Sequence, residues 1–253
     1  MRKEKLLFLG LSLGFITACG PASTSEKSEI VRGTENTKAS KSNEQAINTL
    51  SDAEKAEGWE LLFDGQTTNG WHSYLKGNPE GWQVREGILH TPGKQGDIVT
   101  DKEYENFEVV VEWKIEEQGN SGIFYHVVED PDYPRMHETG PEFQIIDDQN
   151  YPQELTESQK TGANSDVKAP TVAASNPPGE WNHTRINVNQ GKVGFWLNGK
   201  KIIDYDMESP EWQELVAKSK FAPMDYAKVR KGHIGLQDHG GPVAFKNIKI
   251  KEL

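Results

Sequence analysis

The chain has 253 residues, of which 34% are hydrophobic and 26% are charged, and its formal net charge is −11. This composition is typical of a globular protein with a sizeable core. The acidic balance excludes the basic surface of a nucleic-acid-binding protein, whereas an uncharged ligand such as a sugar meets no electrostatic penalty.

Residues 1–18 have the features of a targeting segment. Arg2, Lys3 and Lys5 precede an apolar run at 6–16, which is too short to span a bilayer as a helix. Small residues then lead to Cys19, the only cysteine, so no disulfide framework is available. The pattern resembles a bacterial lipoprotein signal peptide that is cleaved before Cys19, with a lipid on the thiol. An ordinary secretory signal is the alternative.

The lipoprotein interpretation predicts both charge and location. Cleavage before Cys19 removes a net charge of +2 and takes the formal charge from −11 to −13. Each lipid CH₂ buried in a bilayer contributes about 0.8 kcal/mol, so two or three acyl chains anchor a protein firmly. We therefore expect a membrane-anchored lipoprotein in the periplasm or at the cell surface. Residues 19–57, which are rich in small polar and charged side chains, are expected to form a flexible linker.

Strand signals dominate 58–253, which we take as one domain. Residues 107–115 alternate between apolar and mostly charged side chains, as in a half-buried antiparallel strand. Residues 184–206 predict three short strands, because Gln190-Gly191 and Asn198-Gly199 are hairpin turn pairs. Residues 233–253 predict two more strands.

One helix is expected near 209–220, where Ser209 can cap the first turn and Pro210 suits the first position. Its apolar stripe is assigned to packing rather than to function. Many short strands with tight turns and one short helix predict an all-β protein, a jelly-roll sandwich of two antiparallel sheets.

Three segments carry polar groups where a simple outer face would carry Lys and Glu: 119–128, 140–149 and 232–241. In 140–149, Glu142 and Gln144 share one face and Phe143 and Ile145 share the other. Amides, carboxylates, imidazoles and aromatic rings suit a groove that binds sugars. The alternative is that these faces are merely solvated.

The long connection 148–179 contains no convincing strand. Connections of this length tend to be functional or disordered, so we expect this one to cover one end of the groove. A divalent metal is a further candidate ligand of the groove, although no local spacing requires one. The residues that could converge on it are His126, His137, Glu142, Asp147, Asp148 and His239.

Seven stretches taken together resemble the 3-keto-disaccharide hydrolase domain, a bacterial family. In chain order they are GWELLFDGQTTNGW, GNSGIFYHV, GPEFQIIDD, TGANSDVKAP, GEWNHTRI, WLNGKKI and HIGLQDHGGPVAFKNIKIKEL. Each is weak alone, but their order makes the resemblance specific, and it covers 58–253. It implies a concanavalin A-like jelly roll, often found in lipoproteins or secreted proteins.

The resemblance implies cleavage of glycosides already oxidised to a ketone at C3. The ketone acidifies the C2 proton, a base removes it, and the C1 substituent leaves from the enolate. Water can then add back. Such a site needs a base with a suitable pKa and a metal, a cation or fixed donors for the enolate oxygen.

Carried onto this sequence, the resemblance implies that His239 or Glu142 is the base. It suggests six substrate-binding residues, namely Asn120, Ser121, His126, Gln144, Asp147 and Gln237, and it makes Glu142, Asp147 and His239 candidate ligands of a metal.

Two departures from the family pattern bear on activity. Many members have a histidine where this chain has Phe195, and an aromatic residue where it has Ser165. A carbohydrate-binding module without catalysis, or a surface scaffold domain without a sugar site, are therefore the competing interpretations.

Overall fold

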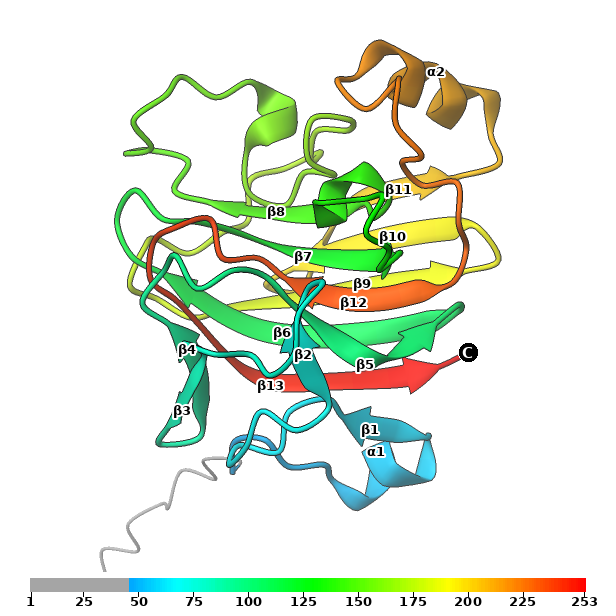
Figure 1. Cartoon of the computed structure of the whole chain (residues 1–253). Coiled ribbons are helices and arrows are strands. Elements are labelled where there is room, and N and C mark those ends of the chain that lie inside the picture. The colour runs from blue at the N-terminus through cyan, green and yellow to red at the C-terminus, as the bar shows by residue number, and fades with distance from the viewer. Residues whose placement is uncertain (1–45) are drawn as a thin grey trace, which may run out of the picture. The chain divides into compact units, whose positions relative to one another are not determined.

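A computed structural model describes residues 46–253, so the predicted signal peptide, Cys19 and most of the predicted linker lie outside the described residues. Within that described part, no helix is long and apolar enough to cross a membrane. Two antiparallel sheets and a few short helices form the fold (Figure 1). This arrangement confirms the predicted sandwich.

The larger sheet has eight strands in the order β11-β10-β9-β6-β13-β4-β3, and β1 also pairs with β13. Its strands are β1 Trp59–Leu61, β3 Gln83–Arg85, β4 Ile88–Thr91, β6 Phe107–Ile115, β9 Asn182–Asn189, β10 Lys192–Leu197, β11 Lys200–Asp206 and β13 Val243–Glu252.

The smaller sheet has five strands in the order β2-β5-β12-β7-β8. They are β2 Trp71–Ser73, β5 Ile98–Tyr104, β7 Asn120–Val127, β8 Glu142–Ile146 and β12 Gly232–Leu236. The helices are α1 Asp52–Ala56 and α2 Pro210–Lys218, with 3-10 turns at Met136–Glu138 and Glu157–Gln159.

Local sequence signals account for several of these elements. Strand β6 occupies the predicted 107–115, and its alternate apolar side chains are buried between the sheets. Both predicted hairpin turns have positive φ at both central residues, which is the geometry of a type I′ turn. Helix α2 begins at Pro210, and the Ser209 hydroxyl accepts a hydrogen bond of 3.1 Å from the Trp212 backbone.

The folded part begins earlier than the predicted linker boundary at 57. The backbone N–H of Asn48 donates to Oδ1 of Asn247 at 2.6 Å, and the backbone N–H of Asn247 donates to Oδ1 of Asn48 at 2.8 Å. Helix α1 then carries a capping box between Ser51 and Glu54. Residues 48–57 therefore belong to the domain, because Asn48 pairs with Asn247 across 199 positions and residues 52–56 form a capped helix.

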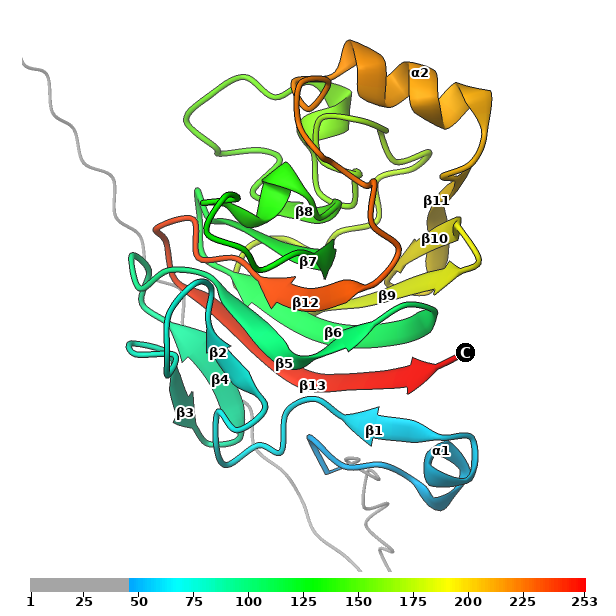
Figure 2. The same ribbon diagram turned by 45° about the vertical axis from the view of Figure 1, so that its right-hand side comes forward.

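The connection after β8 covers the free edge of the smaller sheet. The backbone of Gln144 donates to Ala163 O at 3.0 Å and accepts from Gly162 N at 2.9 Å, while Ser165 N donates to Glu142 O at 3.1 Å. Helix α2 and this connection lie on the same side of the molecule in both views (Figures 1 and 2). Strand β8 is thus held on both sides, which protects its edge and fixes its side chains.

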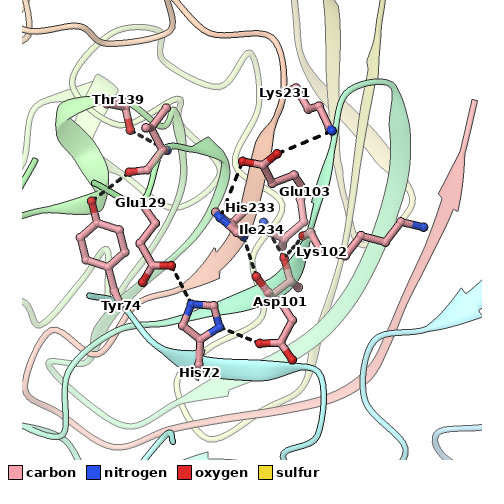
Figure 3. Close-up of polar contacts among 12 residues, drawn as sticks. His72, Tyr74, Asp101, Lys102, Glu103, Glu129, Thr139, Lys231, His233 and Ile234 are labelled. Carbon is pink, nitrogen blue, oxygen red and sulfur yellow. Dashed lines mark hydrogen bonds and ion pairs between the residues drawn. The ribbon is translucent and has the colours of Figure 1, made fainter. Parts of the chain in front are cut away.

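A histidine links strands β2 and β5 to the segment after β7 (Figure 3). His72 contacts Asp101 through Nδ1 at 2.7 Å and Glu129 through Nε2 at 2.8 Å. The other Glu129 oxygen accepts from the Leu75 backbone at 2.6 Å. Burial lowers the pKa of His72, but the two carboxylates outweigh burial and raise that pKa above its ordinary value.

We expect His72 to make stability depend on pH. Because its folded-state pKa is raised, its contribution is complete below the ordinary pKa of about 6.5 and is lost as pH rises through the folded value. The replacement His72→Gln should therefore lower the melting temperature more at pH 6 than at pH 8. Thermal unfolding across this range measures the difference, with the exposed His239→Gln as control. An equal loss at both pH values would contradict the role.

Candidate active site

A cleft of about 300 Å³ opens on the outward face of the smaller sheet. Five separate segments contribute to it: the β7–β8 pair, the 3-10 turn Met136–Glu138 between these two strands, the connection after β8, the turn after α2 and the segment after β12. The principal polar lining residues are Asn120, Glu142, Gln144, Tyr151, Ser165, Asp166, Lys220, Gln237 and His239.

The Glu142 side chain occupies space that residue 122 leaves free. Gly122 lies on β7 beside Gln144, and a Cβ built on it would come within 2.3 Å of Oε1 of Glu142. Any larger residue at 122 would displace this carboxyl group. The alternation of β8 meanwhile turns Phe143 and Ile145 into the core, where both are fully buried.

Burial raises the pKa of Glu142 from 4.5 to about 8. The hydrogen bond with Ser165 and the charge of Lys220 oppose this rise, whereas the charges of Asp166 and Asp97 add to it. Glu142 is only 7% exposed, so desolvation of the carboxylate is the dominant cause. The cleft therefore holds a carboxyl group that exchanges its proton near neutral pH.

A chain of hydrogen bonds orients the amides on the cleft floor. The Ser165 hydroxyl donates to Oε1 of Gln144 at 2.8 Å, and Nε2 of Gln144 donates to Oδ1 of Asn120 at 3.1 Å. Nδ2 of Asn120 then donates to the hydroxyl of Tyr151 at 3.2 Å. This sequence of donors and acceptors assigns the orientation of both amides.

Lys220 supplies a positive charge to the cleft. Its ammonium group forms an ion pair with Asp166, whose other oxygen accepts from Nε2 of Gln159 at 2.7 Å. His137 lies on the same cleft, where burial lowers its pKa and the charges of Lys220 and Arg135 lower it further. A neutral imidazole beside an ammonium group avoids a second positive charge.

The wall that carries Ser165 and Lys220 rests on a buried polar network. Nδ2 of Asn164 donates to the Tyr205 hydroxyl at 2.6 Å, and the Tyr226 hydroxyl donates to Oδ1 of Asn164 at 2.5 Å. Tyr205 also contacts the hydroxyl of Tyr125, which belongs to the smaller sheet. The ring of Tyr205 stacks on that of Trp212 in α2, with the ring centroids 4.3 Å apart.

The segment after β12 brings Gln237 and His239 to the cleft. The backbone of Gln237 donates to Gly122 O at 3.0 Å and accepts from the Ser121 hydroxyl at 2.7 Å. His239 is exposed at the rim. Ser121, predicted to contact substrate, is itself fully buried and supports this segment from below.

Two other predicted substrate-binding residues do not line the cleft. The Asp147 carboxylate accepts hydrogen bonds from the backbones of Gln118, Gln149 and Asn150. Desolvation opposes its ionisation, but these bonds outweigh desolvation and lower the pKa of Asp147. His126 is buried, with φ of 53°, and its Nε2 contacts Glu105 O at 2.8 Å.

The predicted metal ligands do not form a metal site in the described residues. Within 46–253, no three His, Cys, Asp or Glu side chains are grouped so that they could hold a metal ion. Asp147 is engaged by backbone amides, and Glu142 faces the positive charge of Lys220. This donor set does not fit a divalent cation.

The two departures from the family pattern have different settings. Phe195 is fully buried and packs against Phe143, with ring centroids 5.3 Å apart, so its side chain lies in the core rather than the cleft. Ser165 does line the cleft and orients Gln144. Of the two, only the change at 165 alters the cleft wall.

Sequence reasoning assigned no role to Lys220, Asp166 or Tyr151, all of which line the cleft. Lys220 follows the helix whose stripe was assigned to packing. The one available signal was that Tyr151 and Asp166 lie in the long connection expected to cover the groove.

Comparison with known proteins identifies relatives of this chain. Residues 58–251 match the model of the 3-keto-alpha-glucoside-1,2-lyase-like domain family. A 3-keto-disaccharide hydrolase from Bacteroides thetaiotaomicron is 32% identical, over 78% of this chain and 79% of that protein.

Solved structures from Parabacteroides distasonis are also similar. One, provisionally described as a glycosyl hydrolase, is 44% identical, with a TM-score of 0.80 over 82% of this chain and 100% of that one. A second, described in the same way, is 29% identical, with a TM-score of 0.60 over 77% of this chain and 99% of that one.

Glu142 should make stability fall with rising pH. Its pKa is 4.5 unfolded and about 8 folded, so its contribution is complete below pH 4.5 and is lost as pH rises to 8. The Glu142→Gln side chain cannot ionise. The free energy of unfolding of this variant, relative to that of the wild type, should therefore increase by on the order of 2–5 kcal/mol between pH 5 and 8. Chemical denaturation at several pH values measures this gain. The exposed Glu214→Gln is the control and should show no such pH-dependent increase. If the difference in stability between Glu142→Gln and the wild type did not change with pH, the raised pKa of Glu142 would be refuted.

Proposed function

The chain belongs to the 3-keto-alpha-glucoside-1,2-lyase-like domain family, and on that basis we propose that it cleaves glycosides whose C3 carries a ketone. It is a carbohydrate-active jelly roll whose relatives include a 3-keto-disaccharide hydrolase. The proposal depends on one observation, namely that Glu142, Lys220 and His239 line the same cleft.

The proposed reaction begins with removal of the C2 proton. A ketone at C3 acidifies this proton, because the resulting electron pair is delocalised onto the C3 oxygen. Glu142 is the base in our proposal, since a carboxylate with a pKa of about 8 has a much greater proton affinity than an ordinary one. A base poised near the working pH is the most effective one.

Lys220 is proposed to stabilise the negative charge that develops on the C3 oxygen. Its ammonium group is held by Asp166, and it lies near enough to Glu142 to influence that pKa. A fixed positive charge in a partly desolvated cleft acts without reorganising at the moment of reaction. No step is assigned to a metal, because the donor set does not fit one.

The second step expels the C1 substituent. The electron pair of the enolate forms the C1–C2 double bond, and the C1–O bond breaks. His239 is proposed to donate the proton that the leaving oxygen takes. The products are an unsaturated 3-keto sugar and the free alcohol, and addition of water across the double bond gives net hydrolysis.

Location is part of the proposal. We propose that Cys19 carries a lipid that anchors the enzyme to a membrane, supported by the signal-like sequence before it. Replacement of Cys19 by Ser should abolish labelling with palmitate and move the protein to the soluble fraction. Ser25→Ala is the matched control. Undiminished labelling of the Cys19 variant would exclude this site of lipidation.

Substitutions should separate the two steps of the reaction. Glu142→Gln should lower turnover of a 3-keto-glucoside by about 10²–10⁴-fold and also stop exchange of the C2 proton with D₂O. His239→Ala should lower cleavage but retain that exchange. Wild-type kcat/KM should rise with pH, reach half of its maximum near pH 8 and level off above that pH. Cleavage is followed by release of the alcohol, and exchange by nuclear magnetic resonance.

Glu214→Gln, on the exposed face of α2, is the activity control. The reverse pattern, with exchange lost only in His239→Ala, would interchange the two roles. Turnover unchanged in both variants would exclude this cleft as the active site. Glycan binding without product from any 3-keto sugar would instead indicate a carbohydrate-binding module.

A further inference from the structure

A second hollow, of about 280 Å³, adjoins the cleft that contains Glu142. The two share four lining residues: Asn120, Tyr151, Gln153 and His239. A ligand that fills the cleft can therefore extend past His239 into this second hollow.

The two spaces differ in charge. The first is lined by Glu142, Asp166 and Lys220, whereas the second has no acidic or basic lining residue other than His239. Its remaining surface comes from amide side chains, the Tyr151 ring, Pro152 and two glycines. An uncharged ring suits this lining, because its apolar face can stack on tyrosine while its polar substituents meet amides.

The walls of the second hollow are fixed by hydrogen bonds. Tyr151 receives a hydrogen bond from Asn120 at 3.2 Å, and its backbone N–H donates to Asp147 O at 3.2 Å. Beside Gly240, which also lines this hollow, the Asp238 carboxylate accepts from the backbone N–H groups of Gly240 and Lys94, both at 2.9 Å. The hollow is thus preorganised, which lowers the entropic cost of binding.

We propose that this second hollow is the leaving-group subsite and that it selects uncharged, ring-bearing substituents at C1, which stack on Tyr151. The inference rests on the proposed function and extends it to substrate class. The assignment of this subsite depends on the position of His239, which lines both spaces. A substrate that occupies both spaces would place the bond between the sugar and its C1 substituent beside this residue.

Two variants, Tyr151→Ala and Gly241→Leu, change the subsite in opposite ways, and a third, Tyr151→Phe, is the control for the first. Tyr151→Ala removes the stacking surface, while Tyr151→Phe retains the ring and loses only the hydroxyl. Gly241→Leu adds bulk, because a Cβ there would meet only Gly119 Cα, at 4.0 Å, and the backbone has no positive φ. The added side chain therefore introduces no backbone strain.

The test compares 3-keto-glucosides whose leaving groups are matched in acidity but are either a ring or a small alkyl group. Tyr151→Ala should lower the ratio of kcat/KM for the ring-bearing substrate to kcat/KM for the alkyl substrate about fivefold, through KM, in line with about 1 kcal/mol of aromatic stacking. Loss of the hydrogen bond that Tyr151 accepts from Asn120 should affect both substrates alike and so cancel in this ratio. Tyr151→Phe should keep the wild-type ratio, because it retains the ring, and Gly241→Leu should lower the ratio. Equal losses on both substrates would overturn the proposal.

Calorimetric binding of phenyl glucoside and methyl glucoside keeps the subsite testable without turnover. The wild type should bind the phenyl compound more tightly, and both Tyr151→Ala and Gly241→Leu should abolish that preference. If the wild type cleaved no 3-keto-glucoside but still bound phenyl glucoside more tightly than methyl glucoside, the proposed reaction would be refuted and the proposed subsite would stand. The absence of any preference would refute the subsite. Separate assays with 3-keto-disaccharides and aryl 3-keto-glucosides distinguish a sugar ring from a phenolic one.

Discussion

The side-chain amide of Asn164 connects the sheets to the wall that completes the cleft. It donates to Tyr205 and accepts from Tyr226, and it is fully buried, so neither hydrogen bond has a replacement from water. The next two residues in the chain, Ser165 and Asp166, orient Gln144 and Lys220. Losing one partner of a buried polar pair costs about 1–3 kcal/mol. The larger effect here would be displacement of the groups that define the site.

Elements specified by neighbouring residues could be predicted from the sequence. The alternation of β6, the two hairpins and the start of α2 depend on side-chain order and on turn residues with positive φ, which local sequence encodes. The sheet face of β8 was predictable for the same reason. Its outward position identified Glu142 and Gln144, which do line the cleft.

Features that depend on distant contacts could not be predicted. Asn48 pairs with Asn247, and Lys220 reaches Asp166 across 54 positions, so neither has a local signal. Asp147, predicted to bind substrate, does not line the cleft, because β8 ends at Ile146 and the carboxylate of the next residue accepts hydrogen bonds from the turn. The high pKa of Glu142 likewise arises from burial under a wall that distant segments supply.

Strand β13 has a consequence for how the molecule is made. It lies inside the larger sheet, paired with β1, β4 and β6, yet it is the last strand in the chain. The larger sheet cannot close before residues 243–252 have been synthesised, because three earlier strands pair with this segment. The order of the strands thus makes β6 and β4 parts of one sheet only after β13 has been placed between them.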